Sequence, residues 1–234
     1  QLPYLQEEDP WSISMLGTGA ILNLYLKSRK SSQLSGLVGF LPANDQLGGN
    51  RMLVTGDFNL QLRNSFGMGE ALGLTWQQIQ VQSPRLQLRY EQPFMFGSAF
   101  GSNLHFELFK KDSSFLNLNF RAGVQYAFGG NRSARIFYHS FSTTLLTIDS
   151  MLIRSTRRLP DQIDQRTTQL GMDYEWFNTD YRFNPRKGSE LRFVGMAGIR
   201  TIRVNNNISS ISDPLQPGKT FGSLYDSLNM RAST

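Results

Sequence analysis

Several features that define other protein classes are missing from this chain of 234 residues. Cysteine is absent, which excludes disulfide bonds and thiolate metal sites within the chain. Histidine occurs only at His105 and His139, so no zinc site or other metal site is expected. No run approaches the roughly 18 consecutive apolar residues of a transmembrane helix, so the sequence predicts none.

The charge pattern argues against a nucleic-acid partner. The net charge is +6, but the positive residues are spread along the chain and form no basic block. The glycine-rich stretch 67–73 lacks the GxGxxG spacing of a dinucleotide site, and no helix is expected after it. We therefore expect no cofactor.

The stretch 116–128 alternates strictly between apolar and mostly polar residues. Such a period of two over thirteen residues predicts a strand with one apolar and one polar face. A strand of this length exceeds the five or six residues typical of soluble domains, and a bilayer crossing takes about 9–11. The apolar positions are Leu116, Leu118, Phe120, Ala122, Val124, Tyr126 and Phe128.

Similar alternation, separated by turn signals, recurs along the chain and predicts about ten strands with no helix. Residues 1–15 give no firm element, and residues 142–166 and 205–219 are predicted as polar loops. The predicted strands besides 116–128 cover residues 20–27, 33–41, 52–64, 70–81, 85–92, 102–110, 132–141, 168–177 and 189–204, and a last strand is expected within 220–230.

The fold class predicted from this pattern is all-β, with strands joined mainly by hairpins. A soluble β-sandwich and a transmembrane antiparallel β-barrel both fit an alternating pattern. The strand lengths favour the barrel, in which the apolar face meets lipid and the charged face lines a wet lumen. The charged residues expected on that face are Arg63, Arg89, Glu91, Glu107, Arg121, Asp173, Glu175 and Arg192.

Three segments resemble the BamA/TamA family of outer-membrane barrel-assembly factors. Asp180, Pro185 and Gly188 match an Asp…Pro-x-x-Gly turn that precedes a long strand in that family. The stretches 64–69 and 90–96 resemble its Gly-x-Gly turn followed by a Pro-aromatic turn. Residues 20–40 look like the end of a periplasmic POTRA domain running into the first barrel strand.

The resemblance implies a division of the chain into two parts. Residues 1–32 would be the end of a POTRA-like domain and its joint, and residues 33–234 would be the first part of a barrel of about sixteen strands. The Arg-Gly-Phe lid-loop motif of the family is absent, because the chain would end before reaching it.

The resemblance also implies an assembly, insertion or translocation factor of the outer membrane of Gram-negative bacteria. Its first barrel strand would form a lateral gate whose exposed edge templates client β-strands. The implied partners are outer-membrane lipids, client β-barrel proteins and accessory periplasmic or lipoprotein subunits. The gate strand would comprise Gln33, Leu34, Ser35, Gly36, Leu37, Val38, Gly39 and Phe40.

Two other functions fit parts of the pattern. A passive channel or porin-like barrel would share the polar lumen. A barrel enzyme would need a His–Ser pair, and His139 with Ser140 is the one that the sequence offers. Adjacent strand residues point to opposite faces, so these two side chains are not expected to meet, and we expect no enzyme activity.

Overall fold

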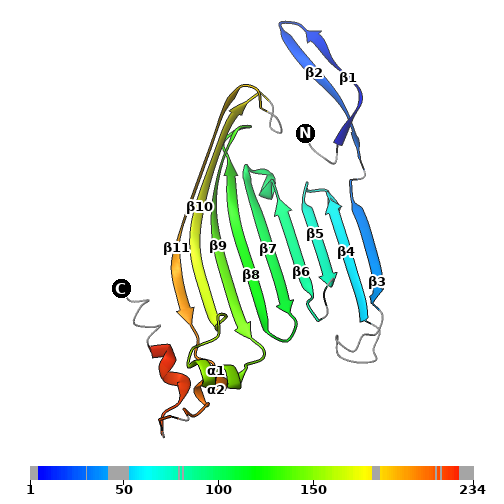
Figure 1. Cartoon of the computed structure of the whole chain (residues 1–234). Helices are drawn as coiled ribbons and strands as arrows, with labels where there is room; N and C mark the ends of the chain where they lie inside the picture. Colours follow the sequence, from blue (N-terminus) through cyan, green and yellow to red (C-terminus); the bar gives the residue numbers. More distant parts are fainter. Residues whose placement is uncertain are drawn as a thin grey trace.

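The computed structural model describes residues 5–29, 31–41, 53–78, 80, 82–180, 185–213, 215, 216 and 218–226. Two antiparallel sheets hold most of them (Figure 1). The strands are β1 Leu5–Leu16, β2 Gly19–Ser28, β3 Gln33–Leu41, β4 Leu53–Arg63, β5 Ala71–Gln78, β6 Arg85–Gln92, β7 Phe100–Lys111, β8 Phe115–Ala127, β9 Arg132–Leu145, β10 Gln165–Thr179 and β11 Gly188–Ile202. The helices are α1 Ser150–Thr156 and α2 Asn206–Ser209, with short 3-10 turns η2 Met95–Gly97 and η3 Phe221–Ser223.

The larger sheet is a nine-stranded meander. Its strands follow the chain in order from β3 to β11, and each pairs antiparallel with its sequence neighbours. The sheet is curved and open, with β3 and β11 at opposite edges (Figure 1). The predicted all-β class with hairpin connections is confirmed. Across the described residues, no helix is both long and apolar enough to span a membrane.

The register keeps residues of like character on one face. His105 pairs with Arg121, and Arg121 pairs with His139, whereas Leu104 pairs with Ala122. Throughout β3 to β10, odd-numbered residues pair with odd-numbered residues. Between β10 and β11, odd-numbered residues pair with even-numbered ones. The odd-numbered residues of β3–β10 and the even-numbered residues of β11 therefore share one face, called here the polar face. All eight charged residues expected on one face lie on it, as predicted.

The opposite face, called here the apolar face, exposes hydrophobic side chains along its whole width. Among the described side chains of this sheet, only Leu37, Val194 and Met196 are exposed large hydrophobics on the polar face. The exposed large hydrophobics of the apolar face are Leu34, Val38, Phe40, Val54, Phe58, Trp76, Leu88, Phe100, Leu104, Phe120, Val124, Tyr126, Ile136, Leu170, Met172, Leu191, Phe193 and Ile199. An uncovered apolar surface of this extent marks contact with another apolar phase or partner.

Buried residues of the sheet gather on the polar face. Phe137 is 3% exposed and lies between Gly123 on β8 and Gly171 on β10, its cross-strand partners. A Cβ on Gly171 would lie 2.6 Å from Cε2 of the Phe137 ring, so the ring fills the space that a side chain there would take. The Arg121 guanidinium stacks on the same ring, 5.0 Å from its centroid. A curved sheet crowds the side chains on its concave side, so this packing marks the polar face as the concave one.

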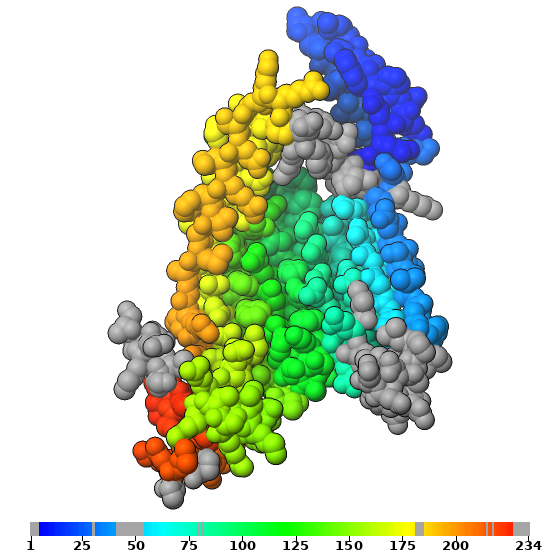
Figure 2. All heavy atoms as spheres, viewed as in Figure 1, coloured from blue at the N-terminus to red at the C-terminus, as the bar shows by residue number. Residues whose placement is uncertain are grey.

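The N-terminal hairpin corrects the prediction that residues 1–15 hold no firm element. Strand β1 pairs with β2 in a separate two-stranded sheet, which projects beyond the end of the larger sheet (Figure 2). Its register shifts between Glu7 and Asp9 and between Asp9 and Ser12, around Pro10. Proline has no N–H to donate and is tolerated at such irregularities, which hide the strand from a period-of-two search.

The segments after β9 and β11 correct three further predictions. Strand β9 runs to Leu145, and the loop predicted for residues 142–166 contains α1. The strand expected within 220–230 is instead the 3-10 turn Phe221–Ser223 followed by helical residues 224–226, and the rest of that range lies outside the described residues. Ile153, Ile208, Phe221 and Tyr225 form a small buried core between these segments. Helices this short leave too few apolar positions to show a period of 3.6.

The packing of Phe137 over Gly171 generates a test by a double-mutant cycle. Gly171→Ala should destabilise the protein because the new methyl group meets the Phe137 ring. Phe137→Leu should relieve part of that loss, giving a favourable coupling of roughly 0.5–3 kcal/mol in denaturant unfolding. Gly73→Ala is the matched control, because its Cβ would meet nothing nearer than Arg89 Cβ at 3.7 Å. Additive losses in the cycle would contradict the packing.

Candidate functional site

Strand β3, the predicted gate strand, lies at an edge of the large sheet. It pairs with β4 over its whole length, from Gln33 opposite Gln61 to Leu41 opposite Leu53. Its other side faces no strand among the described residues. Strand β11 at the opposite edge is equally unpaired on its outer side within the described part of the chain. Each edge presents a row of backbone donors and acceptors that another strand can complete.

The two glycines of β3 differ in their surroundings. A Cβ on Gly39 would lie 2.6 Å from the Thr55 hydroxyl oxygen, so a side chain at Gly39 would displace Thr55. A Cβ on Gly36 would meet nothing closer than 3.8 Å and fits without rearrangement. Neither glycine offers a side chain for cross-strand packing, which weakens the attachment of β3 at these two positions. The role of β3 as a gate stays a prediction.

The turn between β4 and β5 is organised by a buried carboxylate that sequence reasoning missed. Glu70 is 2% exposed, and its two oxygens accept the backbone N–H groups of Phe66 at 2.6 Å and Met68 at 3.1 Å. Burial raises the pKa of the Glu70 carboxyl, but the backbone hydrogen bonds outweigh this and hold the pKa below its ordinary value. A glutamate directly after a Gly-x-Gly turn is the signal that would have found it.

The two turns that resemble the family's Gly-x-Gly and Pro-aromatic turns are in contact. The Gln92 amide donates to the carbonyl oxygen of Met68 at 2.9 Å, and Tyr90 donates its hydroxyl hydrogen to Gln92 at 3.0 Å. Asn64 accepts the Gly69 N–H at 2.8 Å and closes the first turn. The structure therefore joins these two stretches by hydrogen bonds at the end of β4–β7.

Asp180 and residues 185–188 join where β10 ends and β11 begins, and the Asp180 N–H donates to the Lys187 carbonyl oxygen at 3.0 Å. One Asp180 carboxylate oxygen accepts the N–H groups of Arg186 at 2.9 Å and Lys187 at 3.1 Å. Gly188 has φ +114°, and a Cβ there would collide with the Asn178 carbonyl oxygen and lie 2.6 Å from Thr179 Cα. The backbone geometry thus requires glycine at position 188, and Asp180 supplies the acceptor for two backbone N–H groups. Pro185 follows a stretch, residues 181–184, that lies outside the described residues.

The polar face carries networks rather than isolated charges. His139 bridges two strands, with its ring nitrogens 2.9 Å from Asn119 Oδ1 and 3.1 Å from Gln169 Oε1. Ser140 points to the apolar face, opposite Phe120, so the expectation that His139 and Ser140 do not meet is confirmed. No group of three or more His, Asp or Glu residues in the described part of the chain is arranged to hold a metal ion.

One ion pair on the polar face is largely shielded from water. Arg135 on β9 donates to the Asp173 carboxylate on β10, with Nε 2.8 Å from Oδ2, and Asp173 is 7% exposed. Arg135 lies opposite Gln125 and, with it, lines a hollow of about 280 Å³ that also contacts Arg63 and Glu91. A second pair, Arg85 with Glu107 at 3.3 Å, is more exposed. The sequence identified Asp173 as polar-face but not its partner Arg135.

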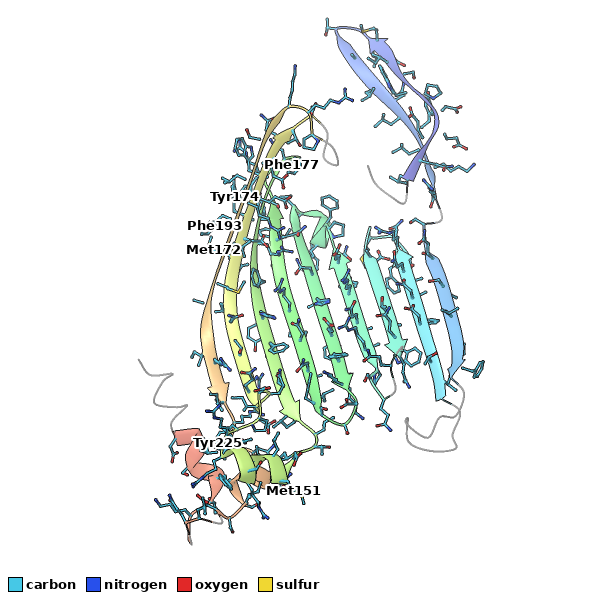
Figure 3. All side chains as sticks on the ribbon, viewed as in Figure 1. Met151, Met172, Tyr174, Phe177, Phe193 and Tyr225 are labelled. Carbon is cyan, nitrogen blue, oxygen red and sulfur yellow. The ribbon has the colours of Figure 1, made fainter. Side chains whose placement is uncertain are left out.

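Aromatic side chains form a row, called here the aromatic row, on the apolar face near one end of the strands. The cross-strand register places Phe100 opposite Tyr126 and Tyr174 opposite Phe193, with Ala134 between the two pairs. The rings of Phe100 and Tyr126 meet edge to face at 4.8 Å. Figure 3 shows Met172, Tyr174 and Phe193 along β10 and β11 toward the turn between them. Such a row is typical of the interface between hydrocarbon and water.

Comparison with known proteins gives similarity to solved structures and to no known sequence. No protein-family model matches this chain, and no curated protein sequence does. Among solved structures, the chain is similar to BamA from Haemophilus ducreyi lacking POTRA domains 1–3, with a TM-score of 0.48 and 14% sequence identity. The similarity covers 85% of this chain and 40% of that one. A likeness at this TM-score establishes neither family membership nor function, and both stay predictions.

The geometry of the β10–β11 turn predicts a ranking of variants. Asp180→Ala should cost roughly 0.5–2 kcal/mol, because two backbone N–H groups lose their common acceptor, and Asp180→Asn should cost less. Gly188→Ala should cost more than either, because the backbone itself must move. Urea unfolding of the folded protein in detergent measures all three. A Gly188→Ala variant as stable as the parent would contradict this geometry.

Proposed function

We propose that this chain is part of a bacterial outer-membrane β-barrel whose apolar face contacts lipid and whose polar face lines an aqueous lumen. The main support for this proposal is the nine-stranded meander, in which exposed hydrophobic side chains occupy one face and ion pairs and amides occupy the other. A soluble sandwich would cover such a face with a second sheet, and none packs there among the described residues. The aromatic row would lie at a membrane interface.

The connections suggest an orientation in the membrane. One end of the sheet, called the turn end, carries the connections 64–70, 93–99, 128–131 and 180–187, together with the aromatic row. The other end, called the loop end, carries the longest connection, residues 146–164, with α1. Outer-membrane barrels have short periplasmic turns and longer extracellular loops. We therefore assign the turn end, beyond which the β1–β2 hairpin projects (Figure 1), to the periplasm.

Within this barrel we assign β3 the role of a lateral gate. In hydrocarbon, unpaired backbone groups cost several kcal/mol each, so the edge of β3 must meet a strand at all times. Because Gly36 and Gly39 contribute no packing side chains, the closing strand can be exchanged for a client strand at low cost. This mechanism makes the protein an assembly or insertion factor rather than an enzyme. Its partners would be client β-barrel proteins, outer-membrane lipids and accessory periplasmic or lipoprotein subunits.

A passive channel is the second candidate, and the polar face supports it. The Arg135–Asp173 pair and the His139 network would line its lumen. This candidate needs no opening of the barrel at β3. The two candidates therefore differ in whether the edge of β3 must separate from its closing strand during function.

The membrane placement predicts opposite outcomes for two arginine substitutions. Leu170 and Met196 are exposed residues on adjacent strands at similar depth, on the apolar and polar faces respectively. Leu170→Arg should cost roughly 2–4 kcal/mol of stability near the bilayer midplane, and Met196→Arg far less. Urea unfolding in phospholipid vesicles measures both. Equal losses for the two variants would rule out a lipid-facing apolar face.

Engineered disulfides distinguish the gate from the passive channel. Because the chain has no cysteine of its own, introduced cysteines can pair only with each other. Ser35→Cys with Asn59→Cys ties β3 to β4 through directly opposite residues and should leave client assembly unchanged. Ser35→Cys paired with a cysteine in the strand that closes against β3 in the intact barrel should abolish assembly, and reduction should restore it. Assembly of an outer-membrane client in vesicles is the readout. Full activity of both oxidised forms would exclude the gate and favour the channel.

A further inference from the structure

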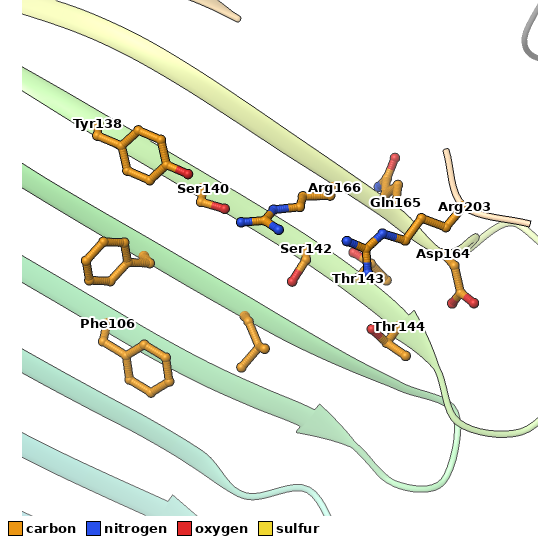
Figure 4. A pocket seen from close by; sticks show the side chains of 12 residues that line it. Phe106, Tyr138, Ser140, Ser142, Thr143, Thr144, Asp164, Gln165, Arg166 and Arg203 are labelled. Atoms are coloured by element: carbon orange, nitrogen blue, oxygen red, sulfur yellow. The ribbon is translucent and has the colours of Figure 1, made fainter. Parts of the chain in front are cut away.

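A cluster of polar side chains lies on the apolar face at the loop end of β9 and β10. There Ser140, Ser142 and Thr144 on β9 and Arg166 on β10 share the face that carries most of the exposed hydrophobic side chains of the sheet. A hollow of about 630 Å³ lies among these side chains, and Phe106, Leu118 and Phe120 line its other side (Figure 4). The hollow thus combines a polar half with an apolar half.

Two arginines supply the charge of the polar half. Arg166 is directly opposite Ser142, and Arg203, just beyond β11, is held beside Asp164 by a backbone hydrogen bond of 2.7 Å. Among the described residues, neither arginine takes part in an ion pair. The guanidinium groups of both line the hollow (Figure 4).

Asp164, the one carboxylate among the residues that line the hollow, is already occupied by two hydrogen bonds. Asp164 Oδ1 accepts the Leu145 N–H at 2.5 Å, and Oδ2 accepts the Asn205 side-chain amide at 2.7 Å. Asp164 thereby fastens the segment after β11 to the end of β9. Two guanidinium groups against one hydrogen-bonded carboxylate leave the hollow with a positive balance, so it is complementary to an anion.

The position of the two arginines along the strands matches the depth at which a lipid headgroup would lie in a membrane. Arg166 is the second residue of β10, and Arg203 lies outside β11, so both lie at the boundary of the sheet. An arginine on the lipid face costs little near the interface but roughly 2–4 kcal/mol at the midplane. From this boundary, the line of Leu118 and Phe120 continues toward the centre of the sheet, where acyl chains would run.

We propose that this hollow binds the phosphate of an anionic membrane lipid, with Arg166, Arg203 and the neighbouring hydroxyl groups on the phosphate and an acyl chain against Leu118 and Phe120. Guanidinium forks match phosphate oxygens, and serine and threonine hydroxyls complete the hydrogen bonds. The apolar half distinguishes a lipid from a soluble phosphate. The inference rests on the proposed placement of the apolar face in the membrane.

Native mass spectrometry of the purified protein in an uncharged detergent tests this directly. Phosphatidylglycerol and phosphatidylcholine with identical acyl chains are added separately, and we expect one phosphatidylglycerol to bind about tenfold more tightly. Arg166→Gln with Arg203→Gln should remove that preference. Arg192→Gln with Arg200→Gln, which removes the same charge from the polar face of β11, should retain it.

Inorganic phosphate distinguishes the source of the anion. A lipid site that uses the apolar half should keep its phosphatidylglycerol when inorganic phosphate is added in excess. Displacement by phosphate would overturn the lipid assignment in favour of a soluble anion. Equal binding of the two lipids, or a preference that survives the double glutamine variant, would overturn the site itself.

Two further measurements keep the outcome interpretable. If the double glutamine variant does not fold, Arg166→Lys with Arg203→Lys keeps both charges but loses the guanidinium fork, and it should weaken the preference without abolishing it. Insertion of the parent protein into phospholipid vesicles is measured separately. Failure to insert, with the lipid preference intact in detergent, would refute the membrane proposal alone, and insertion without any preference would refute the lipid site alone.

Discussion

The in-register antiparallel ladder is the constraint on which the rest of this structure depends. Side chains alternate across a strand, so one shifted residue would move a whole strand's hydrophobic set to the other face. From β3 to β10 every pairing joins odd-numbered residues to odd-numbered ones. Between β10 and β11 odd-numbered residues pair with even-numbered ones, and in β11 the charged residues accordingly stand at even positions. The apolar face, the polar networks and the aromatic row all follow from this register.

Glycine and aspartate permit the ladder to turn and to pack. Gly188 allows the sharp entry into β11, and Asp180 satisfies the N–H groups that this turn leaves unpaired. Glu70 does the same inside the turn before β5, where its burial would be unfavourable without the backbone donors that surround it. Gly171 instead leaves room for Phe137, which secures the concave side of the sheet.

The two faces of the sheet impose opposite demands on polar groups. On the concave face, Arg135 and Asp173 satisfy each other, and His139 uses both ring nitrogens across strands. On the apolar face, Arg166 and Arg203 have no carboxylate partner among the described residues, and they lie only where the sheet ends. A cation without a carboxylate partner is tolerable at an interface, because water or a lipid headgroup can meet it there.

Much of this architecture was determined by the sequence alone. The period of two located β3 and β6 to the residue and assigned the eight charged residues to one face, because strand alternation is a local property of the chain. Its failures were β1, whose register is broken around Pro10, and α1 and α2, which are too short for helical periodicity. Only the tertiary structure brought Gln92 to Met68, paired Arg135 with Asp173, and placed Arg203 beside Asp164. These contacts join residues that are distant in the chain, and their positions follow from the cumulative register and curvature of many strands rather than from any local pattern.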